Sequence, residues 1–504
     1  MSGCLVGSYT GGGGQSVESR GSRGYEAPPI DLHDTIDRIQ PGMRAATRAV
    51  RTQRAVRIVR SVVERRWLPL QAAWEAECSQ LAPAERSLLR DITSGTLRHL
   101  AYYDRLLDYV EPRAAQDGHL RVLAAATLYQ AERMERAPTL SALCRAAADS
   151  CPSSLTKARV ESACRQVAGL PARERRDMLC PASALSLPSW LHTRLRTQGP
   201  LSEYGPLLLE RPDSLSLCVP PQLYSRSEYL QLLRAAGHPA SPSGLAPHGV
   251  LVGTRPRDVG ALPGLTERRV HVQDAVQQFG ASLLRPLAAG DRVLDACAAP
   301  GGKSRALLGH QPHAAVLALE VDRRKADAMA ADMAARATTA SRVAVSRGDA
   351  LDPAAWWDGV PFGAVLLDAP CSASGLLRTL PEAKVHQSEA SLHASAAKQL
   401  RLLHALWPLL RPGGELLYST CSILSEENEA IVSAFLAATA DARPARLRRP
   451  KAAPKAAAAS RGSNVAAVVE LPPWHVQRRG PAGLIFYPCS QHQGGFVALL
   501  QKDG

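Results

Sequence analysis

Residues 293–303 read Val-Leu-Asp-Ala-Cys-Ala-Ala-Pro-Gly-Gly-Lys, a short apolar run that ends in an acid before a pair of glycines. The run predicts a strand, and the helical pattern after it predicts that the glycines turn the chain into a helix. Glycine lets the backbone pass close to a ligand because it has no Cβ, and helix N-termini favour electron-rich groups. Lys303 would stand at the positive end of the helix dipole, where a cation is disfavoured. We therefore expect Lys303 to have a function.

Gly302-Lys303-Ser304 also resembles the end of a phosphate-binding P-loop. That motif requires a glycine five residues before its second glycine. Cys297 occupies that position, so the sequence favours another kind of ligand loop.

Composition limits the possible partners of the chain. The 504 residues are enough for two or three domains, and no apolar run of membrane-spanning length is present. A net charge of +14 favours a polyanionic partner, most simply nucleic acid. The 11 cysteines are scattered without a Cys-x-x-Cys pair, which argues against zinc and against a disulfide framework. We expect a monomer that binds neither metal nor membrane.

The sequence pattern divides the chain into four parts. Residues 1–40 are Gly/Ser-rich and predict a disordered tail, residues 45–175 predict an all-helical domain, and residues 185–285 predict a small α+β module that contacts RNA. Residues 286–504 predict an α/β domain with a flexible basic insertion at about 440–480, which contains Arg446, Arg448, Arg449, Lys451 and Lys455. The location expected is the cytoplasm, or an organelle if the tail is a transit peptide.

Strands and helices alternate from residue 290 onward, which is typical of a doubly wound α/β domain. Strands are predicted at 292–296, 316–320, 342–346, 364–368 and 415–420, and a terminal hairpin at 484–487 and 496–500. Ligands of such domains bind at the carboxyl ends of the strands, and this is where the polar residues Glu320, Asp349 and Asp368 fall. Glu320 follows the glycine turn by roughly 20 residues, where dinucleotide folds place an acid on ribose hydroxyls.

Two cysteines follow adjacent strands of this domain. Cys371 lies in Asp368-Ala369-Pro370-Cys371, and Cys421 lies in Thr420-Cys421-Ser422. A buried cysteine is more often a small apolar core residue. Because both would lie at the ligand edge of the sheet, we favour a chemical role, with a cation such as Lys303 favouring a thiolate.

The three segments at 295–303, 368–371 and 420–422, in this order, resemble the RNA cytosine-5 methyltransferases of the RsmB/Sun (NSUN-type) family. Gln273-Asp274 and Pro381-Glu382-Ala383-Lys384 also resemble segments of that family, and the region at 85–130 resembles the NusB-type domain of RsmB proteins. The resemblance implies a Rossmann-like methyltransferase domain behind a NusB-like RNA-binding domain and a small α+β module. The reaction implied is cytosine-C5 methylation of 16S-type small-subunit rRNA.

The resemblance also implies roles for single residues. Cys421 would be the nucleophile that adds to cytosine C6, Cys371 would assist product release, and Asp368 and Lys303 would act beside them. S-adenosylmethionine would be held by Cys297, Ala298, Ala299, Pro300, Gly301, Gly302, Lys303, Glu320, Asp349 and Asp368.

Other functions stay open on the sequence alone. A tRNA cytosine-5 methyltransferase belongs to the same class, although the NusB-like region favours ribosomal RNA. A DNA enzyme would use the Pro-Cys cysteine without Thr-Cys-Ser. A non-catalytic RNA-binding assembly factor would not need the pair Cys371 and Cys421.

Overall fold

The computed structural model describes residues 41–504 except 66–67, 79, 113–116, 135–136, 149–153, 254–258, 337–338, 340 and 447–474. The expected N-terminal tail at 1–40, with any transit peptide, lies outside the described residues, as do Arg448, Arg449, Lys451 and Lys455. Among the helices that are described, none is long and apolar enough to cross a membrane.

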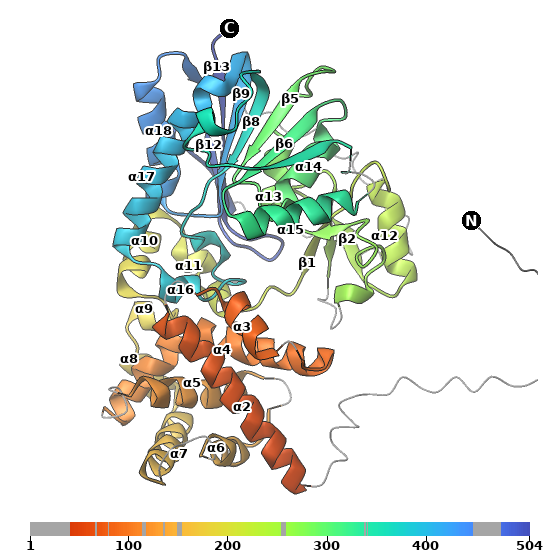
Figure 1. Cartoon of the computed structure of the whole chain (residues 1–504). Helices are drawn as coiled ribbons and strands as arrows, with labels where there is room; N and C mark the ends of the chain where they lie inside the picture. Colours follow the sequence, from red (N-terminus) through yellow and green to blue (C-terminus); the bar gives the residue numbers. More distant parts are fainter. Residues whose placement is uncertain are drawn as a thin grey trace, which may run out of the picture.

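The N-terminal region is a bundle of α-helices, drawn in red to yellow at the bottom of Figure 1. Its helices are α2 (Pro41–Glu64), α3 (Leu70–Cys78), α4 (Pro83–Val110), α5 (Gly118–Arg133), α6 (Leu140–Ala148) and α7 (Ser154–Gly169). Apolar faces repeat at three- to four-residue spacing and meet in one core that includes Val59, Leu89 and Leu123. The prediction of a helical N-terminal region is confirmed.

Short helices lead from the bundle along the side of the larger domain: α8 (Ala172–Met178), α9 (Pro181–Ala184), α10 (Ser189–Gln198), α11 (Leu201–Tyr204) and the 3-10 helix η2 (Gly205–Leu209). Leu191, Leu195 and Tyr204 pack into the core of the larger domain, and the Tyr204 ring stacks on that of Tyr487 at 5.4 Å. This connecting segment is therefore part of the wall of the larger domain.

A small α+β unit follows. It contains β1 (Leu215–Cys218), α12 (Arg226–Ala235), β2 (Ala240–Pro242), β3 (Gly249–Val252), η3 (Val259–Ala261) and β4 (His271–Val272). The strands form an antiparallel sheet in the order β2-β3-β1-β4. Helix α12 begins with a capping box between Ser225 and Glu228, and its Tyr229 packs against Leu217 and Val250 in a separate core.

The larger domain contains a nine-stranded sheet with helices on both faces (Figure 1). Its helices are α13 (Ala275–Ala281), α14 (Gly302–His310), α15 (Arg323–Ala334), α16 (Ala383–His386), α17 (Glu389–Leu406) and α18 (Glu429–Ala438), with 3-10 turns η4 (Pro353–Ala355), η5 (Ser374–Leu376), η6 (Trp407–Leu409) and η7 (Ser425–Glu427). Its strands are β5 (Arg292–Ala296), β6 (Ala315–Glu320), β7 (Val343–Arg347), β8 (Phe362–Asp368), β9 (Leu410–Thr420), β10 (Ala442–Pro444), β11 (Val476–Arg479), β12 (Gly483–Phe486) and β13 (Gly495–Lys502).

The strand order is β11-β12-β13-β9-β8-β5-β6-β7, and β5, β6, β7, β8 and β9 are parallel. The chain runs outward from β5 through β6 to β7, then returns to β8 on the other side of β5. Such a reversal opens a crevice at the carboxyl ends of the strands, where α/β proteins bind ligands. The predicted Rossmann-like domain and its terminal hairpin, β12 and β13, are confirmed.

Two strands lie inside the segment predicted to be a flexible insertion. β10 pairs with β13, and β11 pairs with β12. The prediction of flexibility is therefore wrong for residues 442–444 and 476–479, because their backbone groups are held in the sheet ladder.

The helical bundle and the larger domain meet at α16, which follows the loop that carries Cys371 (Figure 1). The buried Lys384 ammonium donates to the carbonyl oxygens of Arg98 at 3.1 Å, Leu208 at 3.2 Å and Leu185 at 3.5 Å. The Arg98 guanidinium donates in return to the carbonyl oxygen of Arg378 at 2.8 Å. Burial lowers the pKa of Lys384 to about 7. One side chain thus joins three separate segments of the chain.

Candidate active site

The loop after β5 carries the seven consecutive residues predicted to hold a cofactor, Cys297 to Lys303. Two positive φ angles, 62° at Cys297 and 90° at Gly301, turn the strand into helix α14. The Ala298 N–H donates to the carbonyl oxygen of Leu319 at 2.9 Å, and the Gly301 N–H donates to that of Ala298 at 2.7 Å. These bonds fix the loop at the carboxyl edge of the sheet.

Gly301 is needed for a reason that differs from the one expected. A Cβ at this position would meet Met333 Cε at 2.2 Å and Met329 Cγ at 3.2 Å, both on α15. The glycine thus gives room to the core behind the loop, in addition to its left-handed φ. A Cβ at Gly302 would have no neighbour closer than 3.6 Å.

Glu320 is the last residue of β6, and Asp349 follows the last residue of the neighbouring strand β7 by two positions. The Glu320 carboxylate, 8% exposed, accepts from the Ala299 N–H at 3.3 Å and from the Asp322 N–H at 3.0 Å. It therefore touches the predicted cofactor loop. Asp349 is exposed and accepts from the Leu351 N–H at 2.9 Å, within its own turn.

Asp295 is a fully buried carboxyl at the end of β5, and the Ser304 hydroxyl donates to it. Burial raises the pKa of Asp295 to about 7, and the bond from Ser304 counteracts only part of that effect. The carboxyl ties the first turn of α14 to β5, which keeps the neighbouring Lys303 in place.

Lys303 and Asp368 form an ion pair, with Nζ 2.6 Å from Oδ2. The Ser419 hydroxyl donates to the other carboxylate oxygen of Asp368 at 3.0 Å. Burial disfavours the Lys303 ammonium, but the Asp368 carboxylate outweighs this effect and raises the pKa of Lys303. The ion pair therefore links the first turn of α14, which follows β5, to the end of β8. The bond from Ser419 links the end of β8 to β9.

Cys371 and Cys421 lie side by side, with their sulfur atoms 3.1 Å apart. The hydrogen bond with Cys421, together with burial, raises the pKa of Cys371 well above its ordinary value. Burial and this contact therefore favour the neutral thiol form of Cys371. Lys303 lies close enough to Cys421 for the two side chains to interact electrostatically.

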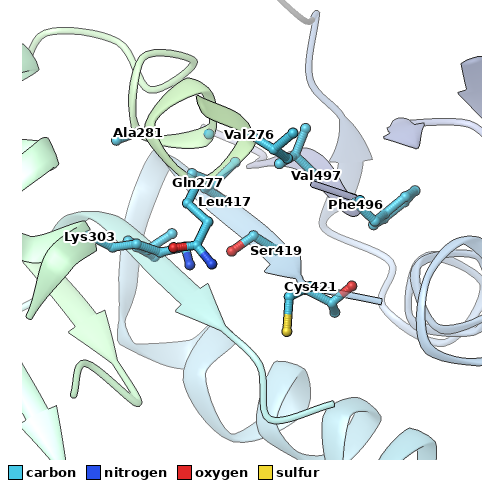
Figure 2. Close-up of a pocket in the computed structure, with 13 residues that line it drawn as sticks. Val276, Gln277, Ala281, Lys303, Leu417, Ser419, Cys421, Phe496 and Val497 are labelled. Carbon is cyan, nitrogen blue, oxygen red and sulfur yellow. The ribbon is translucent and has the colours of Figure 1, made fainter. Parts of the chain in front are cut away.

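Cys421 is one of the residues that line a small hollow open to solvent. Figure 2 shows Lys303, Gln277 and Ser419 converging on this space, with Cys421 beside them and its sulfur directed to the other side, while Val276 and Phe496 supply apolar walls. The lining of the hollow therefore combines a thiol, a cation and an amide with apolar side chains.

The residues beneath the cysteines were not predicted from the sequence. The Glu427 carboxylate, fully buried, accepts from the N–H of Ser372 at 2.7 Å and also from its hydroxyl. Asn428 accepts from the Thr420 hydroxyl at 2.6 Å and donates to the carbonyl oxygen of Ser422 at 3.0 Å. Glu427 thus holds the residue after Cys371, and Asn428 holds both neighbours of Cys421.

The only sequence signal for this support was an acidic-polar run, Ser425-Glu426-Glu427-Asn428, directly after Thr-Cys-Ser. Such a run is ordinarily a solvated helix start.

Comparisons with known proteins agree with this architecture. A family model described as 16S rRNA methyltransferase RsmB/F matches residues 281–501. Ribosomal RNA small subunit methyltransferase B of Xanthomonas campestris pv. campestris is 37% identical over 369 residues, covering 71% of this chain and 81% of that protein. The protein of the same name from Pseudomonas putida is 34% identical over 397 residues, covering 74% and 86%.

Solved structures share the fold at lower identity. The crystal structure of PH0851 superposes with a TM-score of 0.66 at 20% identity, covering 89% of this chain and 99% of that one. NSun6 from Pyrococcus horikoshii superposes with a TM-score of 0.50 at 18% identity, covering 63% and 98%.

Proposed function

The chain belongs to the family of 16S rRNA methyltransferases RsmB/F, and from this membership we propose that it methylates carbon 5 of a cytosine through a covalent adduct with Cys421. As a member it is an RNA methyltransferase that uses S-adenosylmethionine and acts on ribosomal RNA. The observation that carries the proposal is the 3.1 Å contact between the sulfur atoms of Cys371 and Cys421 at the ligand edge of the sheet.

The residues around the glycine loop fit S-adenosylmethionine. The loop backbone lies at the sheet edge, and the Glu320 carboxylate lies against it, where related folds bind ribose hydroxyls. We assign cofactor binding to loop 297–303 with Glu320, Asp349 and Asp368. When bound, the cofactor supplies an electrophilic methyl group.

Cys421 begins the reaction because cytosine C5 is a poor nucleophile by itself. The Cys421 thiolate adds to C6, which forms a sulfur–carbon bond and gives C5 the reactivity of an enamine. The target base must leave its stack to reach the hollow beside Cys421.

Asp368 and Lys303 orient the base during this addition. The Asp368 carboxylate accepts a hydrogen bond from the N4 amino group of the base, and the Lys303 ammonium beside it stabilises the negative charge that develops on the ring as the sulfur adds. Its ion pair with Lys303 and the bond from Ser419 hold it in one orientation.

Cys371 acts in the second half of the reaction. The bond with Cys421 is the largest cause of its raised pKa, and burial is the next; the first cause is removed once the Cys421 sulfur is joined to C6. Cys371 can then release its proton to solvent and accept the C5 proton. Elimination of the Cys421 thiolate restores the aromatic base and frees the product.

Methylation of a transcribed small-subunit rRNA with radiolabelled S-adenosylmethionine tests this proposal. Nucleoside mass spectrometry should find 5-methylcytidine with the wild-type protein and none with Cys421→Ala. A tRNA transcript serves as the comparison substrate. Methyl transfer to another atom of the base or to ribose would refute the proposed reaction.

A further inference from the structure

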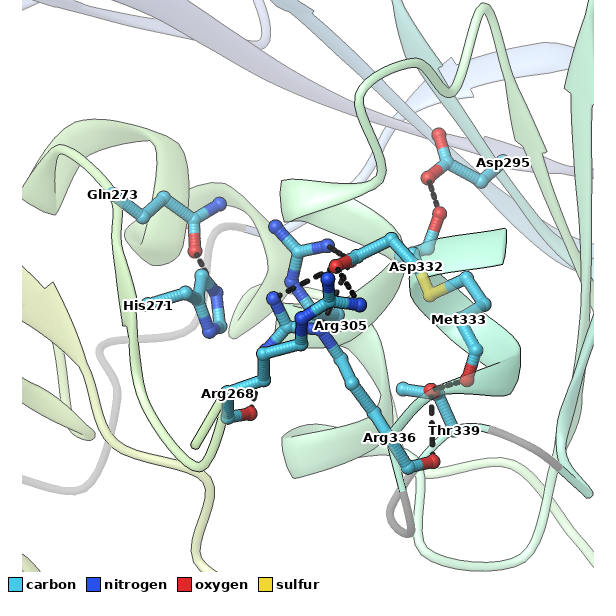
Figure 3. A network of polar contacts seen from close by, with 10 residues as sticks. Arg268, His271, Gln273, Asp295, Arg305, Asp332, Met333, Arg336 and Thr339 are labelled. Carbon is cyan, nitrogen blue, oxygen red and sulfur yellow. Dashed lines mark hydrogen bonds and ion pairs between the residues drawn. The ribbon is translucent and has the colours of Figure 1, made fainter. Parts of the chain in front are cut away.

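Three arginine side chains converge on one carboxylate behind the glycine loop (Figure 3). Asp332 lies 2.9 Å from Arg305 Nη1, 2.9 Å from Arg336 Nε and 3.6 Å from Arg268 Nη1. The arginines come from α14, from the residues after α15 and from the segment before β4. Within the described residues no other acidic side chain pairs with them, so the cluster keeps an excess of positive charge.

Two of the three arginine side chains that carry this excess charge are largely shielded from solvent. The side chains of Arg305 and Arg336 are 12% and 11% exposed, whereas that of Arg268 is 49% exposed. Burial and the neighbouring Arg336 lower the pKa of Arg305 to about 10. Cations in such surroundings are stabilised by a further anion, and Arg268 leaves the cluster open to solvent on one side.

A buried amide without a partner adjoins the arginines. Gln273 is 5% exposed; its Oε1 pairs with His271 Nε2 at 3.2 Å, and its Nε2 has no partner among the described residues. A Cβ built on Gly302 would lie 3.6 Å from Gln273 Nε2 and 3.8 Å from Arg305 Nη2. Two donors therefore converge beside the first residue of α14, whose N–H groups have no partner within the helix.

We propose that the cluster of Arg268, Arg305 and Arg336, with Gln273, binds a backbone phosphate of the RNA substrate. Guanidinium groups match phosphate oxygens in geometry and charge, and Asp332 balances only one of the three positive charges. The proposal rests on the proposed function, since it requires an RNA bound at Cys421.

The position of the cluster suits a nucleotide that flanks the target base. Arg305 follows Lys303 by two residues on α14, and such residues point to nearly opposite sides of a helix. The cluster therefore lies on the other side of α14 from Lys303 and the reacting groups. A phosphate held there would fix the direction in which the strand enters the hollow.

RNA binding by Arg268→Ala tests the proposal, because this exposed side chain can be removed with little effect on the core. Arg443→Ala is the matched control: Arg443 is 55% exposed, pairs with Asp503 and lies on β10, toward the opposite edge of the sheet. Binding of transcribed small-subunit rRNA is measured at several salt concentrations. Arg268→Ala should weaken binding several-fold and reduce the slope of log Kd against log salt by about 0.7, the value for one single-strand phosphate. Arg443→Ala should change neither.

The variant Asp332→Asn should change RNA affinity in the opposite direction. Removal of the competing carboxylate should tighten RNA binding, whereas an ion pair with a purely structural role would give no gain. Weaker RNA binding by this variant at an unchanged melting temperature would overturn the proposal, as would equal effects of Arg268→Ala and Arg443→Ala.

The cofactor carboxylate is the other anion that could use these donors. Calorimetry with S-adenosylmethionine separates the two sources: a loss of cofactor affinity in Arg268→Ala with unchanged RNA binding would overturn the RNA assignment. Methyl transfer by the wild-type protein, measured in parallel, shows whether the proposed function itself holds.

Discussion

The Glu427 carboxylate accepts a hydrogen bond from the Ser372 N–H at 2.7 Å, although 55 positions separate the two residues. Burial raises the pKa of Glu427, while its bonds with Ser372 oppose that rise. The bond connects the 3-10 turn η7, which precedes α18, with the residue next to Cys371. The spacing between the two cysteines therefore depends on a group that does not touch the substrate.

Glu427→Ala should slow methyl transfer more than it weakens binding. The variant leaves the buried Ser372 N–H without an acceptor, which costs about 1–3 kcal/mol of stability. Displacement of the Cys371 loop by about 1 Å is expected to lower kcat on the order of 100-fold, with little change in KM for S-adenosylmethionine.

Glu427→Gln is the control for this prediction. Its amide oxygen can still accept from the Ser372 N–H, so most of the activity should return. Equal loss of kcat in the Ala and Gln variants would show that the charge of Glu427, rather than its hydrogen bond, is what matters.

Substitution of each of the two cysteines should block a different step of the reaction. Cys421→Ala should form no protein–RNA adduct and no product, because no thiolate reaches C6. Cys371→Ala should accumulate an adduct that survives denaturing gel electrophoresis, because the C5 proton is not removed. The assignment is falsified if Cys421→Ala forms the adduct and Cys371→Ala does not.

Gly301→Val should abolish S-adenosylmethionine binding and lower the melting temperature. A β-branched residue at φ 90° is strained, by about 1–2 kcal/mol, and its Cβ would collide with Met333. Gly302→Ala is the stability control, since its Cβ meets nothing within 3.5 Å. Calorimetry that finds unchanged affinity in Gly301→Val would remove the loop from the cofactor site.

Asp295 should make the folded state less stable as pH rises. Its pKa is raised from 3.8 to about 7 by burial, so the folded state binds more protons than the unfolded state between these values. Stability from this group is present below about pH 4 and is lost by about pH 7, by an amount on the order of a few kcal/mol. Asp295→Asn, which can still accept from Ser304, should lack this dependence in denaturant unfolding. The same slope in both proteins would contradict the assignment.

The features of the fold and the site that could be predicted from the sequence are those determined by residues close together in the chain. The apolar run at 293–296 and the glycines at 301 and 302 specify strand, turn and helix locally. The ends of β8 and β9 were predictable because apolar runs, at 364–367 and 416–418, end a few residues before Cys371 and Cys421.

The parts that did not follow depend on distant pairing. Glu427 is indistinguishable in the sequence from the exposed acids that often begin a helix, and only the pairing of β8 with β9 brings Ser372 to it. Residues 476–479 follow an Ala/Pro/Lys-rich segment that predicts no strand, and they become β11 because β12 offers a free edge.

The three hydrogen bonds from Lys384 to backbone carbonyl oxygens fix the distance between the helical bundle and α16. If one of the segments that carry Arg98, Leu185 and Leu208 moved away from the others, at least one hydrogen bond from the Lys384 ammonium would break. The helical bundle and the edge that carries Cys421 therefore keep one separation. In the proposed reaction, an RNA that contacts both the helical bundle and Cys421 would have to match that separation, so the shape of the RNA around the target cytosine would contribute to substrate selection.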